Sequence, residues 1–366
     1  MKTAFKSNPK RNPMSTKLLL VMALLVTQIT TAQTSISTFK AGTDSADFFL
    51  KKGLQEKQNG RRMESLKNFE KAARFDSSSK TIIAELAAAY LDLRKYANAR
   101  LMYKKLVYLG EATPANYKQL LTLSFQLKQN DDVLLYAEKL KQADPKEKIA
   151  YYLGKVNYDL ENYGDAIKHL NKAESEEPTN AEVPYMIARS YADMTNYKLA
   201  VPYFHKAIAL DSSKSLWIYE LSLIFYAMHD DKNALAYMLK AGEKGYKRDN
   251  DYLENLSIAY LNVGQIDKGV EMLNEILKRR PSDLNILKMV AEAYYNKGRY
   301  EDAINYWDKV LEYDKENYAT LYMIGMAYQK SGGKDNKEKG ITLCDRAIQL
   351  DPSLASLKQK KMTMGL

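Results

Sequence analysis

The stretch NYKLAVPYFHKAIALDS at residues 196–212 decides the fold, because two other parts of the chain repeat its pattern. NYGDAIKHLNKAESEEP at residues 162–178 begins 34 residues earlier, and RYEDAINYWDKVLEYDK at residues 299–315 begins 103 residues later. Each segment has an alanine followed four places later by a bulky apolar residue: Ala166 and Leu170, Ala200 and Phe204, and Ala303 and Trp307. Offsets of one and about three periods of 34 residues predict an array of helical repeats.

The same period divides most of the chain into nine repeats, placed at residues 46–79, 80–113, 114–146, 147–180, 181–214, 215–249, 250–283, 284–317 and 318–354. Positions are counted from the first residue of each repeat. Position 8 reads Gly53, Ala87, Leu121, Gly154, Ala188, Ser222, Ser257, Ala291 and Gly325. Position 20 reads Ser65, Ala99, Val133, Ala166, Ala200, Ala234, Gly269, Ala303 and Gly340. Only the third repeat lacks a small residue at both positions, so this register is not accidental.

This pattern resembles the tetratricopeptide repeat (TPR), which has a small residue at position 8, an aromatic at 11, Ala at 20, a bulky residue at 24 and Pro near 32. The resemblance implies an all-α protein, a right-handed superhelix (α-solenoid) of about nine helix-turn-helix repeats. Positions 8 and 20 are expected where the two helices of a repeat cross, because only small side chains let the backbones approach to ~8–10 Å. Residues 355–366 are expected to form a short capping helix or tail over the last repeat.

The first segment is predicted to be an export signal rather than part of the fold. Residues 1–17 are basic and polar, and Leu18 to Val26 form an apolar run that ends before the small residues Thr30 and Ala32. This order of regions is typical of a secretory signal peptide over residues 1–32, cleaved near Ala32/Gln33. An uncleaved anchor is the alternative, although the apolar run is short for a bilayer span. Residues 33–45 are polar and are expected to be a flexible lead-in.

Composition argues against nucleic-acid binding and against catalysis. The net charge of +10 falls to +5 without the signal segment, which carries five cationic residues and no acidic ones. That is a mildly basic protein, not one built to neutralise phosphates. The three histidines fall at unrelated repeat positions, and no GxxxxGK[ST], GxGxxG, HExxH or GxSxG motif occurs. We therefore predict no enzyme, no catalytic residue, no metal site and no cofactor, with Cys344 a buried core residue.

A second face of the first helix of each repeat carries the candidate binding residues. Positions 2, 5, 9 and 12 lie away from the core side of that helix at 100° per residue. Seven of the eighteen residues at positions 5 and 12 are Tyr, far above the share that 28 Tyr in 366 residues would give. The resemblance implies that this face lines a groove for peptides or helices. The predicted groove residues are Tyr151, Tyr158, Tyr185, Tyr219, Tyr226, Lys148, Lys155 and Arg189.

Tyr151, Tyr185 and Tyr219 recur every 34 residues and are expected to form a partly exposed ladder with Lys155 and Arg189 as cationic handles for an acidic partner. The alternative is that these tyrosines only pack between repeats. We expect an exported, periplasmic or secreted, non-enzymatic scaffold that binds a protein or peptide. It would meet a membrane only through an envelope partner. A glycan or small-ligand binder using the same tyrosines is the alternative function, and an enzyme or nucleic-acid binder is a remoter third.

Overall fold

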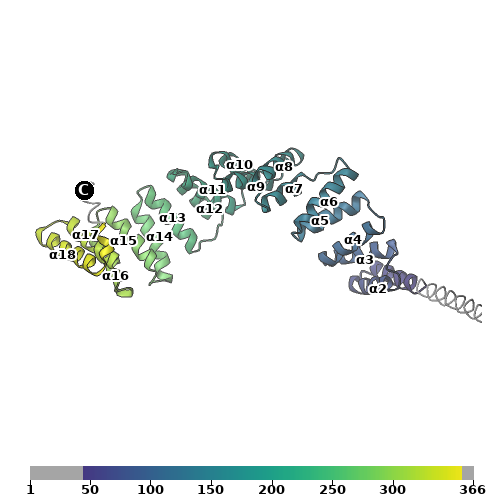
Figure 1. The fold of residues 1–366 in the computed structure, drawn as a ribbon, viewed down its shortest axis with the longest axis horizontal. Coiled ribbons are helices and arrows are strands. Elements are labelled where there is room, and N and C mark those ends of the chain that lie inside the picture. Colours follow the sequence, from purple (N-terminus) through teal and green to yellow (C-terminus); the bar gives the residue numbers. More distant parts are fainter. Residues whose placement is uncertain (1–43, 357–366) are drawn as a thin grey trace, which may run out of the picture. The chain divides into compact units, whose positions relative to one another are not determined.

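The computed structural model describes residues 44–356, and Figure 1 shows them as a succession of helices. The predicted signal peptide, residues 33–43 of the lead-in and residues 357–366 of the predicted cap lie outside the described residues. Ser45 and its neighbour Asp44 are already helical, so the lead-in prediction is wrong for these two residues. The described residues form helices joined by short turns and contain no strand, which confirms the predicted all-α class.

The chain divides into two compact units, residues 1–160 and 161–366. The first unit contains a helix over residues 44–58, then α2 (Arg62–Phe75), α3 (Lys80–Asp92), α4 (Tyr96–Tyr108), α5 (Pro114–Gln126), α6 (Asn130–Ala143) and α7 (Ala150–Asp159). From α2 on, each helix of this unit packs against the next one along the chain. The helices fall two to a repeat in the predicted register.

The second unit contains α8 (Tyr163–Glu176), α9 (Glu182–Asp193), α10 (Tyr197–Leu210), α11 (Ser215–Ala227), α12 (Asp231–Glu243), α13 (Asn250–Asn262), α14 (Ile266–Arg279), α15 (Leu284–Asn296), α16 (Tyr300–Tyr313), α17 (Tyr318–Ser331), α18 (Lys334–Leu350) and the short 3₁₀ helix η1 (Pro352–Leu354). Here too each helix packs against its successor. The unit boundary falls inside the predicted fourth repeat, whose first helix, α7, has 10 residues, whereas the other first helices from α3 to α17 have 12 to 14.

A left-handed residue at position 15 ends the first helix of every predicted repeat in the described chain. Its φ lies between 54° and 85° at Gly60, Arg94, Lys128, Glu161, Thr195, His229, Gly264, Gly298 and Gly332. The turn after α3 shows the bonding: the amide of Lys95 donates to the carbonyl of Tyr90 at 2.8 Å, which satisfies one of the free carbonyls at the helix end. Five of the nine residues are not glycine, so the repeats impose this conformation on side chains that disfavour it.

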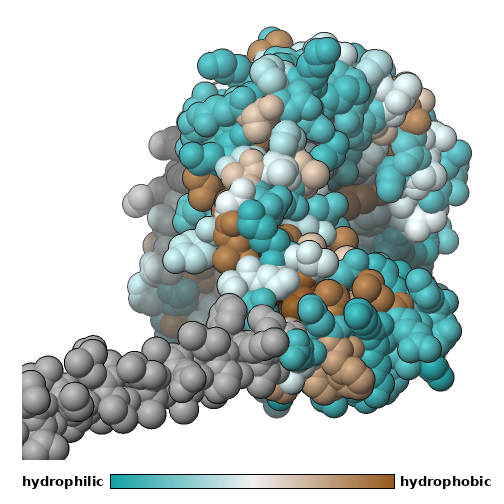
Figure 2. Space-filling view, turned by 90° about the vertical axis from the view of Figure 1, so that its right-hand side faces the viewer, coloured by the Kyte–Doolittle hydropathy of each residue, from teal (hydrophilic) through white to brown (hydrophobic). Residues whose placement is uncertain are grey.

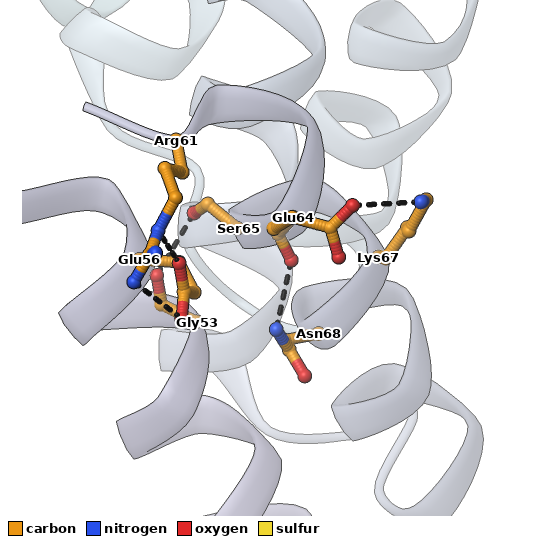
Figure 3. A network of polar contacts seen from close by, with 7 residues as sticks. All are labelled: Gly53, Glu56, Arg61, Glu64, Ser65, Lys67 and Asn68. Carbon is orange, nitrogen blue, oxygen red and sulfur yellow. Dashed lines mark hydrogen bonds and ion pairs between the residues drawn. The ribbon is translucent and has the colours of Figure 1, made fainter. Parts of the chain in front are cut away.

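The helix crossings lie where the small residues predict them. All eighteen residues at positions 8 and 20 are buried. A Cβ built on Gly340 would lie 2.5 Å from the carbonyl oxygen of Gly325, its crossing partner. In the first repeat, the hydroxyl of Ser65 donates to the carbonyl of Gly53 at 2.9 Å, while Arg61 and Glu56 pair across the turn (Figure 3). Close backbone approach is therefore confirmed in the first, seventh and last repeats, where Gly53 meets Ser65, Ser257 meets Gly269 and Gly325 meets Gly340.

The third repeat fits larger crossing residues into the core. Leu121 and Val133 are both buried, in one cluster with Tyr136 and Leu140. At the other end of the chain, the predicted burial of Cys344 is confirmed: its sulfur lies against Gly325 and donates to the carbonyl of Tyr322 at 3.5 Å. The core therefore consists of crossing residues within repeats and bulky residues beside them.

The first repeat differs from the others on the side that faces a preceding repeat. Positions 7 and 10 are occupied by Lys52 and Gln55, both exposed, whereas the following repeats place mostly Leu, Ile or Ala there and bury nearly all of them. Phe48 at position 3 is 61% exposed, while Ile82 at the same position of the second repeat is buried. A polar outer side is typical of a repeat that begins an array. On the face drawn in Figure 2, hydrophobic residues lie scattered among hydrophilic ones.

Candidate functional site

The candidate site is the face formed by the first helices of the second unit. We call it the first-helix face, and define it by the residues at positions 2, 5, 6, 9, 12 and 13 of α9, α11, α13, α15 and α17. It contains a cavity of about 330 Å³ between α13 and α15. The lining residues are Ile258, Leu261, Asn262, Ile266, Met289, Glu292, Ala293 and Asn296. An apolar floor with amides and one carboxylate at its rim can hold an apolar side chain of a partner and hydrogen-bond its backbone.

Tyr185, predicted to project into the groove, is buried instead. It is 8% exposed, and its ring stacks on that of Trp217 with centroids 4.5 Å apart and planes 17° from parallel. Burial, with the nearby Glu220 carboxylate adding to it, raises the pKa of Tyr185 to about 12. The stack joins α9 to α11, so this residue holds neighbouring repeats together.

Glu220 on α11 forms the polar centre of this part of the face. Its carboxylate interacts with the hydroxyl of Tyr185 and lies 3.9 Å from the guanidinium of Arg189. Burial raises the pKa of Glu220, and the attraction to Arg189 only partly offsets this. Its Oε2 atom is buried and accepts no hydrogen bond within the described chain. Arg189 therefore faces a carboxylate of its own protein.

Tyr219 is also buried, at 8% exposure. Its ring stacks on Tyr246 with centroids 4.1 Å apart, and its hydroxyl accepts a 2.7 Å hydrogen bond from the amide of Asn255. The expectation that Tyr185 and Tyr219 are partly exposed is therefore wrong. The physical reason is that position 5 of one repeat lies against positions 3 and 6 of the next, and the neighbouring repeat covers it. Tyr226, two turns along α11, is 46% exposed and remains available.

The other predicted groove residues lie in the first unit, on or just before α7. Tyr151 is half-buried, with its ring 6.1 Å from that of Phe125. Lys155 pairs with Asp159 at 3.2 Å, and its ammonium also lies 5.4 Å from the ring centre of Tyr158. Lys148 is exposed. The structure thus gives Lys155 and Arg189 acidic neighbours, which weakens both as handles for an acidic partner.

Carboxylates are the feature of the first-helix face that the sequence reasoning missed. Asp251 and Glu254 lie on α13 and Glu292 on α15, and none of the three takes part in an ion pair within residues 44–356. Reading positions 2, 5, 6 and 9 together along the repeats, rather than the tyrosines at 5 and 12, would have found them. Together with Glu220, they make the face acidic.

Other chemistry-bearing groups do not gather on this face. Burial lowers the pKa of His169 and of His205, and the Nδ1 atom of His205 lies 3.3 Å from the hydroxyl of Tyr237 on the second helices. The described residues contain no group of His, Cys, Asp or Glu side chains that could hold a metal ion. Among the same residues, no helix is both long and apolar enough to cross a bilayer.

Comparison with known proteins gives two family matches. A model described as "Anaphase-promoting complex, cyclosome, subunit 3" matches residues 126–207, and one described as "Tetratricopeptide repeat" matches residues 285–317. No curated protein sequence matches the chain.

Solved structures resemble this chain at low sequence identity and low TM-score. The TPR protein YrrB, described as having an unusual peptide-binding site, is 22% identical with a TM-score of 0.42, over 52% of this chain and 97% of its own. MamA is 21% identical with a TM-score of 0.41, over 47% of this chain and 93% of its own. The TPR domain of P58(IPK) is 16% identical with a TM-score of 0.30, and the match covers 86% of this chain and 99% of that domain.

The segment that matches the tetratricopeptide-repeat model coincides, within one residue, with the eighth predicted repeat, α15 and α16. The other predicted repeats share its left-handed turn, all but the third share its buried small residues, and a packed helix pair recurs in the second, third, fifth, sixth, seventh and ninth. Because the matched segment is one of a series built alike along the described chain, the protein belongs to the tetratricopeptide-repeat family.

Proposed function

We propose that this protein is a non-enzymatic scaffold that binds a segment of a partner protein on the first-helix face of its second unit. Repeats of this family are in general protein-binding modules rather than catalytic ones. The observation that carries the proposal is the cavity between α13 and α15, where Ile258, Leu261 and Met289 are only half-buried. Half-buried apolar side chains that line a hollow, with a few polar groups beside them, can receive an apolar side chain of a partner.

The polar groups around the cavity suit an extended backbone. The amide nitrogen of Asn262 already donates to Asp231 at 2.9 Å, which leaves its carbonyl free to accept from a partner's N–H group. Asn296 is exposed at the same position of the next repeat and can donate and accept. A partner segment lying across α13 and α15 would therefore find apolar contact beneath it and hydrogen bonds along it.

The burial of Tyr185 and Tyr219 weighs against the glycan alternative. Sugar binding by stacking needs an open aromatic face, and both rings are already stacked on Trp217 and Tyr246. The proposal of a protein partner does not depend on these two rings, because the half-buried apolar residues of the cavity supply the contact area for the partner.

The proposed setting is the cell envelope or the secreted space. Its support is the signal-like order of residues 1–32, which lie outside the described residues. N-terminal sequencing of the protein purified from an envelope or secreted fraction tests this. A first residue at or near Gln33 is expected, and a chain starting at Met1 or Met14 in the membrane fraction would favour the anchor alternative.

Selection of random 12-residue peptides displayed on phage, with the purified protein as bait, tests the binding function. Ile258→Gln should weaken the selected peptides more than tenfold, because it removes apolar contact at the cavity without changing the charge. Leu199→Gln is the matched control, since Leu199 is an exposed residue of α10 on the second helices. Peptides that bind both variants as well as the unchanged protein would contradict the proposed site.

A further inference from the structure

We infer that the segment bound on the first-helix face is cationic, rich in Lys or Arg. This inference rests on the proposed function and specifies its partner. It reverses the expectation of an acidic partner, which came from counting Lys155 and Arg189 as open cationic handles. The juxtaposition behind it is a row of carboxylates on α11, α13 and α15 beside the apolar cavity.

The charge of the first helices is one-sided. Helices α9, α11, α13, α15 and α17 carry six carboxylates against three cationic side chains, Arg189, Lys288 and Lys330. Helices α11 and α13 contain no Lys or Arg at all, so Glu220, Asp251 and Glu254 have no cation on their own helices. The interleaved second helices α10, α12, α14 and α16 are almost balanced, with nine acidic and eight basic residues. The acidity therefore belongs to this face and not to the unit as a whole.

The pairing of these charges points the same way. On the second helices, Glu275 is tied to Arg248 at 2.7 Å and to Arg279 at 2.8 Å, so its charge is already matched. On the first-helix face, Asp251, Glu254 and Glu292 form no ion pair within the described chain. Like charges left unmatched along one face raise the local potential and attract a segment of opposite sign.

Glu220 offers the most specific contact in the row. Arg189 lies 3.9 Å from one of its oxygens, which is a long ion pair, and the Glu220 side chain remains 23% exposed. An incoming guanidinium or ammonium could pair with the exposed part of this carboxylate, because both carry several N–H groups. The exposed ring of Tyr226 on the same helix can lie along the aliphatic stem of such a side chain.

The cavity indicates that the partner segment also carries apolar side chains. Glu292 stands at its rim, next to the apolar floor formed by Ile258 and Met289. A segment in which apolar residues alternate with Lys or Arg would place its apolar side chains in the hollow and its cations on Glu220, Glu254 and Glu292. An acidic segment of the same shape would meet three carboxylates at close range.

The peptides selected on the unchanged protein test this inference through their charge. We expect the enriched 12-residue sequences to carry a clear excess of Lys and Arg, and their binding to weaken as salt rises from 50 to 500 mM. Glu254→Gln with Glu292→Gln should weaken them about three- to tenfold, mainly through slower association. The matched control is Glu301→Gln with Glu312→Gln, which removes two exposed carboxylates from α16 and should leave binding unchanged.

The outcomes separate the two proposals. Neutral or acidic peptides that lose affinity with Ile258→Gln would overturn the cationic partner while leaving the site in place. Cationic peptides that lose equal affinity with both carboxylate pairs would show attraction to the whole protein and would overturn the inference as well. Peptides indifferent to Ile258→Gln would overturn the proposed site itself.

Discussion

Adding one methyl group at the crossing of the last repeat should destabilise it strongly. In Gly340→Ala, the new Cβ would lie 2.5 Å from the carbonyl oxygen of Gly325 and 2.8 Å from the backbone nitrogen of Gln329. Both contacts are with backbone atoms of α17, so no flexible side chain can move aside. Overpacking of this kind typically costs ~1–3 kcal/mol.

The same substitution elsewhere should have the opposite sign. A Cβ at Gly164 in α8 meets nothing within 4 Å, so Gly164→Ala adds no clash. It removes the conformational freedom of glycine from a helix, which is worth about 0.5–1 kcal/mol in favour of folding. Both variants replace glycine with alanine, so they differ only in their place in the fold.

Hydrogen exchange followed by mass spectrometry can measure both effects locally. A cost of about 1–3 kcal/mol corresponds to exchange roughly 5- to 150-fold faster in peptides covering α17 and α18 of Gly340→Ala. Exchange in α8 of Gly164→Ala should be slower than in the unchanged protein. Unchanged exchange in α17 and α18, or equal acceleration by the two substitutions, would refute the assignment of position 20 to a tight helix crossing.

Three further predictions concern the turns and the polar centre of the second unit. Thr195→Gly should stabilise the folded protein by about 0.5–1 kcal/mol in a denaturant titration. The left-handed conformation costs a β-branched residue about 1–2 kcal/mol, which is more than the entropy cost of glycine. A loss of stability would contradict this prediction. Tyr185→Ala should lower the free energy of unfolding by about 3–5 kcal/mol, and Tyr226→Ala by less than about 0.5 kcal/mol, because only Tyr185 is buried. Equal melting temperatures of the two variants would contradict this difference. Burial raises the pKa of Glu220, so the folded state holds that proton more tightly than the unfolded chain, and stability falls as pH rises through the raised pKa. Glu220→Gln should therefore raise the melting temperature at pH 7, with a gain that shrinks towards pH 4, and a gain that grew on acidification would contradict the sign.

The period and the small residues of the sequence were enough to predict the repeats. A crossing that admits only Gly, Ala or Ser leaves a mark in the sequence, because a larger side chain there would separate the two helices. Gly325 and Gly340 illustrate this, since a Cβ added to Gly325 would lie 2.8 Å from the carbonyl oxygen of Gly340, and one added to Gly340 would lie 2.5 Å from that of Gly325. The helix pairs, the buried crossings and the buried Cys344 could therefore be predicted without coordinates.

The turns between the helices were harder to predict from the sequence. Position 15 is left-handed in all nine repeats of the described chain, yet it is occupied by residues as different as Arg94, Glu161 and Thr195. The hydrogen bonds that close the helix end come from the backbone, so the side chain can be almost anything that tolerates the strain. Sequence alone gave no reason to single out this position.

The candidate site depended on contacts between repeats, and these only the tertiary structure decided. A helical wheel places Tyr185 and Tyr219 away from the core of their own repeats, which is correct, but it omits the next repeat. That repeat supplies Trp217 to cover the first and Asn255 to bond the second. The charge of the face changed for the same reason, because Arg189 finds Glu220 on the following first helix. Spacing within a repeat fixes which way a side chain points, whereas its exposure and its charge partner depend on residues about one repeat away.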